Sequence, residues 1–199
     1  MTNIYRPKRL LVYVVPFEDG LAPNVTGGIC TLTVCKPTVR RVARIGEDWI
    51  VGMSVRKNGH DINQMIYTMQ VEEKVPFEAY FTDPRFQGKK PDKGDKSGDN
   101  FFARLKGDGP LQVVNRYAQH NSRPDKIQAD LKSPYSVIAE TFWYYGAEAP
   151  KLPPSLCATR VVQGHRRGHR VITDKDTINR FYRWLTRRPT GIHGKPRDP

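Results

Sequence analysis

The sequence predicts an α+β fold built on a curved or closed β-sheet, with short helices between strands and an amphipathic helix near the C-terminus. Several segments have the length and apolar pattern of strands, and the segments between them are too short for regularly alternating long helices. The last fifth of the chain instead carries apolar residues at helical spacing. A chain of 199 residues can bury a sizeable core without disulfides, so we expect residues 1–199 to form one domain.

The N-terminal quarter predicts three strands and one short helix. Residues 10–15 are an apolar run of strand length, and residues 30–35 alternate between Thr and apolar side chains. Pro37 favours a helix start, and apolar residues follow it at spacings of three and four. Gly46 is typical of a helix end, so residues 49–55 are expected to form the next strand.

The middle of the chain predicts a hairpin, a short helix and further strands. The Asn58-Gly59 turn and the alternating residues 65–75 are typical of a hairpin. Residues 76–81 fit a helix of one to two turns that ends before Asp83-Pro84. Further strands are expected within residues 101–105, 111–114 and 135–145, whereas the polar segment 115–134 is not placed.

The C-terminal segment predicts the clearest helix. Thr173 or Asp174 can cap it, and Ile178, Phe181 and Leu185 share one face. We expect residues 160–199 to form a basic helical extension. By contrast, residues 88–100 contain four Lys, three Asp, three Gly and no hydrophobic residue, which predicts a flexible, solvated loop.

The composition indicates a polyanionic partner. The formal net charge is +13 with a pI near 9.8, and residues 160–199 hold eleven Lys or Arg against three Asp. The apolar run at 10–15 is too short for a signal peptide or a membrane span, so we expect a soluble, cytoplasmic protein without membrane contact. Cys30, Cys35 and Cys157 lack metal-type spacing and are interpreted as reduced core residues.

Common catalytic motifs are missing from the sequence. It contains no GxxxxGK[ST] phosphate loop, GxGxxG, HExxH, paired CxxC or GxSxG, so we expect no nucleotide cofactor and no metal. His165 and His169 form a close pair, but the flanking glycines disfavour the helix that a metal site would need. Three arginines around that pair suit phosphate better, because guanidinium groups bind phosphate oxygens bidentately.

A rigid loop and several aromatic side chains predict a base-binding pocket. Gly and Pro shape residues 19–24, where carboxylate and amide groups could read a base edge, and aromatic planes can stack on a nucleobase. Core packing remains the alternative for the aromatic residues, and an ordinary connection the alternative for the loop. The expected base-binding residues are Asp19, Ala22, Asn24, Trp49, Asn100, Trp143 and Tyr145.

Arginines and carboxylates complete the candidate site. The expected phosphate-binding residues are Arg40, Arg41, Arg44, Arg166, Arg167 and Arg170, with a solvated turn as the alternative for the last three. If the protein is an enzyme, the candidate acids or bases are Asp19, Asp48 and Asp99.

Three motifs in one order resemble a known family. They are DGLAPN at 19–24, CTLTVCKPTVRRVA at 30–43 and GEDWIVG at 46–52, with further similarity at 66–71, 77–86, 98–100 and 144–146. This order resembles the nucleotide modification associated domain family, second type, over most of residues 8–150. The resemblance implies a prokaryotic or phage protein linked to DNA base modification. The helix, turn and strand at 37–52 are also similar to PUA, ASCH and YTH-like barrels, which implies a PUA-like barrel that holds a base.

Three classes of function follow. We expect a nucleic-acid-binding module that accepts a flipped, modified base, with DNA favoured over RNA. One alternative is an enzyme acting on a nucleotide or modified base, such as a glycosidic-bond hydrolase. The other is a protein-interaction subunit of a modification or phage-defence complex.

Overall fold

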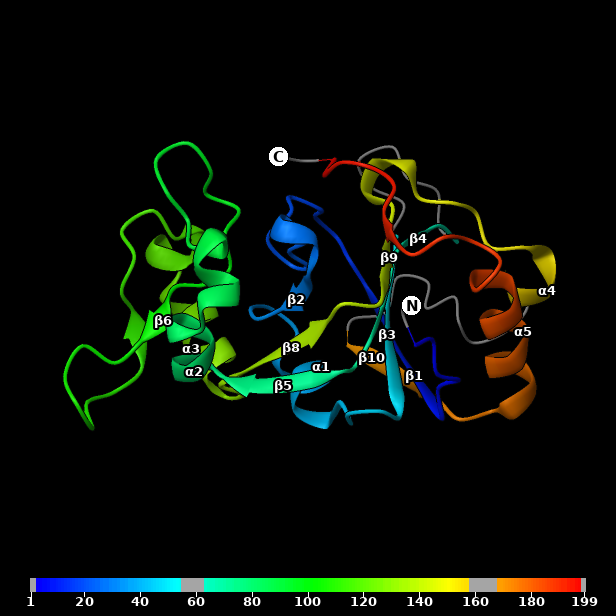
Figure 1. The fold of residues 1–199 in the computed structure, drawn as a ribbon, viewed down its shortest axis with the longest axis horizontal. Coiled ribbons are helices and arrows are strands. Elements are labelled where there is room, and N and C mark those ends of the chain that lie inside the picture. The colour runs from blue at the N-terminus through cyan, green and yellow to red at the C-terminus, as the bar shows by residue number, and fades with distance from the viewer. Residues whose placement is uncertain (1–2, 55–62, 158–167, 198–199) are drawn as a thin grey trace.

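A computed structural model describes residues 3–54, 63–157 and 168–197. Its largest element is a six-stranded sheet in the order β10-β1-β3-β4-β9-β11 (Figure 1). The strands are β1 (Arg9–Val14), β3 (Asp48–Met53), β4 (Met65–Gln70), β9 (Phe142–Tyr144), β10 (His169–Ile172) and β11 (Gly191–Ile192). β1 pairs in parallel with β3, and β9 with β11; the other neighbours are antiparallel.

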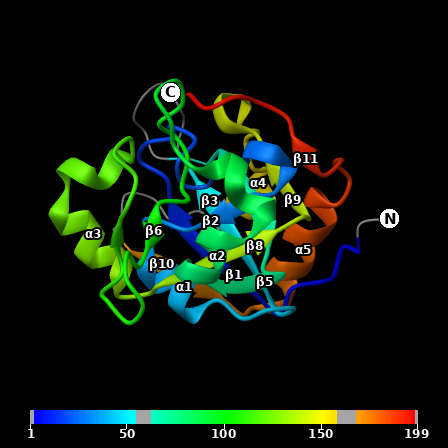
Figure 2. The same cartoon turned by 60° about the vertical axis from the view of Figure 1, so that its left-hand side comes forward.

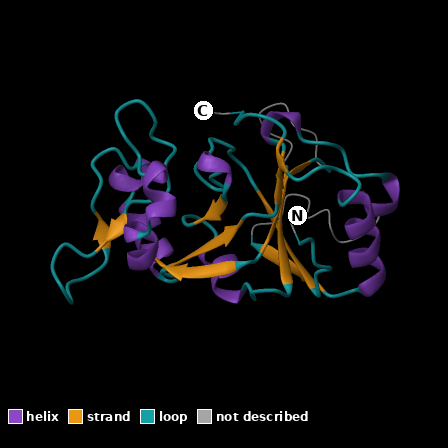
Figure 3. Ribbon diagram, in the orientation of Figure 1, coloured by secondary structure: helices purple, strands orange, loops and turns teal. Residues whose placement is uncertain are grey.

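A three-stranded sheet lies on one side of the large sheet. It consists of β2 (Cys30–Leu32), β8 (Tyr135–Ala139) and β5 (Glu73–Pro76), in that order. On the other side of the large sheet lie α4 (Pro154–Cys157) and α5 (Lys175–Leu185) (Figure 3). Both faces of the large sheet are therefore covered, and the main hydrophobic core contains side chains from both layers.

The remaining elements gather beyond the small sheet, where α3 and β6 lie far from α5 (Figure 2). They include α1 (Pro37–Val42), α2 (Phe77–Thr82), α3 (Pro124–Leu131), β6 (Phe102–Ala103) and β7 (Gln112–Val113). Short 3-10 helices occur at Thr26–Gly28, Pro84–Lys89, Gln119–Ser122 and Gly146–Glu148. A second cluster of buried apolar side chains, including Phe77, Phe101 and Phe102, holds this part together.

The fold is mixed α and β with short helices, as predicted, but the expected closed barrel is wrong. The large sheet is open, with β10 and β11 at its two ends. Two predicted strands are each split between the sheets: 65–75 gives β4 and β5, and 135–145 gives β8 and β9. These breaks at 71–72 and 140–141 let the chain pass from one sheet to the other, so curvature is replaced by two layers.

Several local predictions are confirmed. α1 begins at Pro37, α2 ends before Asp83-Pro84, and α5 is capped by Asp174, whose carboxylate accepts from the Thr177 amide at 2.8 Å. β3 and β4 form the expected antiparallel pair, while the Asn58-Gly59 turn lies outside the described residues. The unplaced segment 115–134 contains α3.

Two segments differ from their expected character. Residues 160–199 supply both edge strands of the large sheet as well as α5, so this segment is built into the sheet where the structure describes it. Within 88–100, Lys89, Asp99 and Asn100 are buried, because they bond to the 19–24 loop and to neighbouring backbone. The solvated part is confined to the residues between them.

Candidate functional site

A cavity of about 460 Å³ opens where the loop after β1, the start of α1 and α3 meet. This volume is within the range of small-ligand pockets. The lining residues are Tyr13, Val15, Pro16, Phe17, Asp19, Leu21, Ala22, Cys35, Lys36, Pro37, Gln119, His120, Arg123, Lys126, Ala129 and Asp130. Two of the predicted base-binding residues, Asp19 and Ala22, therefore lie at this cavity.

The 19–24 loop that borders the cavity is held firmly. Gly20 has a φ of +79°, and a Cβ there would lie 3.0 Å from Pro196. Asp19 Oδ1 accepts from the Leu21 amide at 3.1 Å. Asn24 is buried: its amide group donates to the Gly20 carbonyl at 3.1 Å and its Oδ1 accepts from Lys89 Nζ at 2.8 Å. Asn24 therefore shapes the loop from behind, and its polar groups are already engaged.

Cationic side chains border the cavity. Lys36 is half-buried, with its Nζ 4.9 Å from the centre of the Tyr13 ring, and burial lowers its pKa. Arg123 and Lys126 are exposed at the start of α3, where Arg123 makes only a loose 3.4 Å contact with exposed Asp125. An anionic ligand would therefore meet three positive charges at this opening.

The floor of the cavity contains a buried ionic network. Arg40 has no exposed surface, and its guanidinium contacts Asp130 Oδ1 at 2.9 Å. It also donates to the backbone carbonyls of Cys35 (3.0 Å), Tyr135 (2.8 Å) and Ser133. The other carboxylate oxygen, Asp130 Oδ2, lies 3.2 Å from His120 Nδ1. Arg40, predicted to bind phosphate, is thus committed to the interior, because these acceptors would otherwise be buried without a donor.

The predicted stacking residues lie in the core. Trp49 and Trp143 have no exposed surface and their ring centroids are 5.3 Å apart, beneath Tyr182 of α5. Tyr145 is also buried and stacks on His193. Both faces of β9 are covered by packed layers, which explains why none of these rings reaches the cavity. Its rim instead carries Phe17, whose side chain is 56% exposed.

Two of the three predicted catalytic carboxylates are also structural. Asp48 is buried and receives two bonds from Arg9, at 2.8 and 2.6 Å. Asp99 is buried and accepts from the hydroxyls of Thr31 and Tyr80, each at 2.7 Å. The neighbouring Asn100 donates to the Tyr80 and Phe86 carbonyls. Asp19 is the one candidate carboxylate that the cavity includes.

The other predicted phosphate-binding arginines are spread more widely. Arg41 and Arg44 are exposed at the end of α1, the helix whose first residue lines the cavity. Arg170 is half-buried in β10, opposite Val12 of β1. Arg166, Arg167 and His165 lie outside the described residues.

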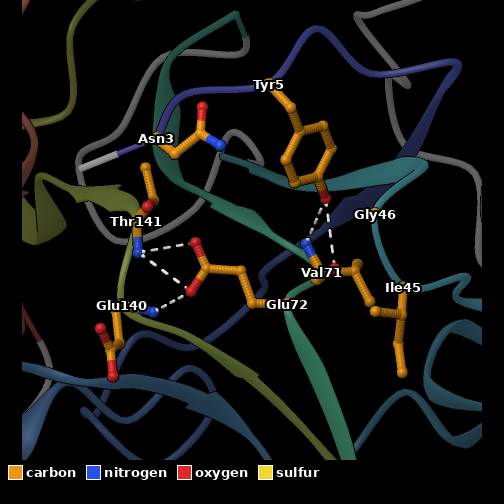
Figure 4. Close-up of a pocket in the computed structure, with 8 residues that line it drawn as sticks. All are labelled: Asn3, Tyr5, Ile45, Gly46, Val71, Glu72, Glu140 and Thr141. Atoms are coloured by element: carbon orange, nitrogen blue, oxygen red, sulfur yellow. Dashed lines mark hydrogen bonds between the residues drawn. The ribbon is translucent and has the colours of Figure 1, made fainter. Parts of the chain in front are cut away.

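A second cavity, of about 590 Å³, lies where the two sheets separate (Figure 4). The carboxylate of Glu72 points to the backbone there, accepting from the Glu140 amide at 2.6 Å and the Thr141 amide at 3.2 Å. The Tyr5 hydroxyl is likewise bound to the backbone of Asp48 and Val71. With two glutamates in its lining and its polar groups already paired, this cavity is poorly suited to a polyanion.

Sequence reasoning missed most of the side chains that surround the first cavity. Phe17 and Lys36 flank predicted elements, whereas His120, Arg123 and Lys126 come from the segment that was not placed. A signal for α3 was present, since Pro124 can occupy a first helical position, with Ile127 and Leu131 spaced four apart.

The described ranges contain no cluster of three or more His, Cys, Asp or Glu arranged to hold a metal ion. No helix among the described residues is long and apolar enough to span a membrane.

Comparison with known families gives one match. The family model described as nucleotide modification associated domain 2 matches residues 7–199, nearly the whole chain. Comparisons with curated proteins and with solved structures give no significant match.

Proposed function

Because the chain belongs to the nucleotide modification associated domain 2 family, we propose that it binds nucleic acid and takes one nucleobase into the cavity beside α1. A modified base in DNA is the ligand that the family description favours. The observation that carries the proposal is a cavity of about 460 Å³ whose opening combines three cations with an exposed aromatic ring.

The opening can supply the interactions that an extruded base requires. Flipping a base out of a duplex costs a few kcal/mol. Stacking on one aromatic ring returns about 1 to 3 kcal/mol. Phe17 provides such a ring at the rim, and Asp19 can accept from an exocyclic amine. The apolar side chains of Val15, Leu21 and Ala22 would then contact the remainder of the base.

The cations can hold the flanking phosphates. Lys36, Arg123 and Lys126 lie at the cavity, and Arg41 and Arg44 follow Lys36 along the short helix α1. A strand whose base enters the cavity would therefore have further positive charges along α1 for its adjacent phosphates. Arg41 and Arg44 remain predicted phosphate contacts, whereas Arg40 supports the cavity from beneath.

The proposal is tested by titrating the protein with plain and modified single-stranded and duplex oligonucleotides at several salt concentrations. The test variant replaces Lys36, Arg123 and Lys126 with Gln. A matched control replaces Lys175, Arg180 and Arg183 of α5 with Gln, which removes the same charge from exposed positions on the far side of the large sheet. Loss of three phosphate contacts should weaken affinity at least tenfold and lower the single-strand salt slope by about 2.

Phe17→Ala tests the base contact separately from the phosphate contacts. It should weaken binding of a modified-base oligonucleotide by about 1 to 3 kcal/mol and leave the salt slope unchanged. If the α5 control weakens binding as much as the cavity variant, the positive charge acts without a site and the cavity proposal is wrong.

The two other functions give distinct results in the same samples. A glycosidic-bond hydrolase that uses Asp19 would release free base from modified DNA, and Asp19→Asn would abolish the release. A protein-interaction subunit would bind oligonucleotides weakly and retain a stable partner in pull-downs from its host. Either result without salt-dependent DNA binding would replace the binding-module proposal.

A further inference from the structure

Cys35 is a half-buried thiol that lines the cavity beside α1. It follows β2 and precedes α1, in a turn where Cys35 and Lys36 both have positive φ angles, of 58° and 45°. The other two cysteines have different surroundings. Cys30 is fully buried in the core, where burial raises its pKa, and the Cys157 thiol donates to the Leu152 carbonyl at 3.3 Å. Cys35 is thus the cysteine that the cavity includes.

His120 reaches the same cavity from a distant part of the chain. Its side chain is almost fully buried, and its Nδ1 lies 3.2 Å from Asp130 Oδ2 without the alignment of a hydrogen bond. Burial lowers the pKa of His120, but the side chains of Asp130 and Cys35 raise it, and the net pKa is about 9. The ring therefore carries a proton at neutral pH between a thiol and a carboxylate.

Arg40 fixes both ends of this group. One guanidinium nitrogen contacts Asp130 Oδ1 at 2.9 Å, while Nε donates to the backbone carbonyl of Cys35 at 3.0 Å. The carboxylate beside the ring and the backbone that carries the thiol are thus held by one buried side chain. Such an arrangement positions a nucleophile, a proton carrier and an orienting carboxylate around one cavity.

We propose that Cys35 is a nucleophile, that His120 carries its proton, and that Asp130 positions the ring. The substrate class is a phosphate-bearing ligand with an unsaturated electrophilic carbon, such as a nucleotide whose base occupies the cavity. The choice of a nucleotide rests on the proposed function, whereas the Cys35–His120 pair does not.

The proposed step is an addition that needs no further reactant. In the resting pair, the proton shared by Cys35 and His120 is on the ring, and the sulfur carries the negative charge. The sulfur forms a bond to the electrophilic carbon, and the electron pair of the attacked double bond moves to its far atom. That atom then takes the proton from His120, which leaves a neutral ring able to recover the proton when the adduct breaks down.

The three cysteines make a direct test within one molecule. The full-length protein is treated with iodoacetamide at pH 7, and the alkylation rate of each cysteine is measured by peptide mass spectrometry. An ordinary thiol is only a few per cent ionised at this pH, so an activated Cys35 should react about tenfold or more faster than Cys157. Cys30 should stay unmodified while the protein is folded, because it is buried.

Variants assign the roles. His120→Gln should slow alkylation of Cys35 at least tenfold without changing the rate at Cys157, and Asp130→Asn should slow it less. Gln119→Ala, at an exposed neighbour of His120, should change neither rate. Reaction of Cys30 would reveal a variant that has unfolded, and the wild-type ratio of Cys35 to Cys157 then still decides the question. The proposal is overturned if that ratio is near one, or if folded His120→Gln leaves it unchanged.

A protection experiment separates this inference from the proposed function. An excess of a deoxynucleoside monophosphate should slow alkylation of Cys35 and leave Cys157 unaffected. If Cys35 reacts rapidly but is not protected, the nucleophile stands and the nucleotide ligand is wrong. If Cys35 reacts slowly while the oligonucleotide titrations still support a base in the cavity, the binding module stands and the nucleophile is wrong.

Discussion

The buried Arg40 side chain should be essential for stability, although its sequence neighbour Arg41 should not. Arg40→Met removes the 2.9 Å contact with Asp130 and leaves the carbonyls of Cys35, Ser133 and Tyr135 without their donor. Breaking a buried ion pair by removing one partner costs about 3 to 5 kcal/mol. Arg41 is exposed, so Arg41→Met should change the free energy of unfolding by less than about 0.5 kcal/mol.

Urea unfolding measures this difference directly. With an m-value of about 2 kcal/mol per M, the midpoint of Arg40→Met should fall by about 1.5 to 2.5 M, while Arg41→Met stays near wild type. A double-mutant cycle with Asp130→Asn isolates the pair. The double variant should be more stable than the sum of the single effects predicts, by at least about 1 kcal/mol. Equal midpoints for Arg40→Met and Arg41→Met would refute the network as the support of the cavity floor.

Two further predictions concern the other ionised groups described above. Because the folded pKa of His120, about 9, exceeds the unfolded value of about 6.5, its contribution to stability is complete below pH 6.5 and is lost as the pH rises through 9. Between pH 6 and 9.5 the wild-type free energy of unfolding should therefore fall by about 2 to 3 kcal/mol more than that of His120→Gln, and parallel urea-derived profiles would contradict this. Glu72→Ala should cost about 2 kcal/mol by removing the acceptor of two backbone amides, whereas the exposed Glu140→Ala should cost under about 0.5 kcal/mol; equal thermal unfolding curves would show that Glu72 does not hold the crossing of the two sheets.

Local sequence patterns predicted the elements whose signals lie within a few residues. Pro37 begins α1, Asp174 caps α5, and the apolar run after Arg9 forms β1. These predictions hold because helix ends and strand periodicity depend on neighbours along the chain. The breaks that divide 65–75 and 135–145 between two sheets have no comparable local signal, since they depend on which distant strand each half pairs with.

The candidate site was only partly accessible to the same reasoning. The 19–24 loop was located correctly at a cavity, through Asp19 and Ala22. The aromatic residues Trp49 and Trp143 were assigned to it on residue type, which does not reveal that α5 covers them. An exposed ring and a buried ring have the same local pattern when both lie in strands, so burial has to come from the packing of layers.

The sequence by itself determined the class of partner and the family. The excess of positive charge and the ordered motifs are properties of the chain in any conformation, and the family match extends over residues 7–199. Only the tertiary structure decided which charges surround one space. Cys35, His120 and Asp130 meet there because β2, α1 and α3 are brought together by packing, and such contacts between distant segments form only when the apolar layers close around them.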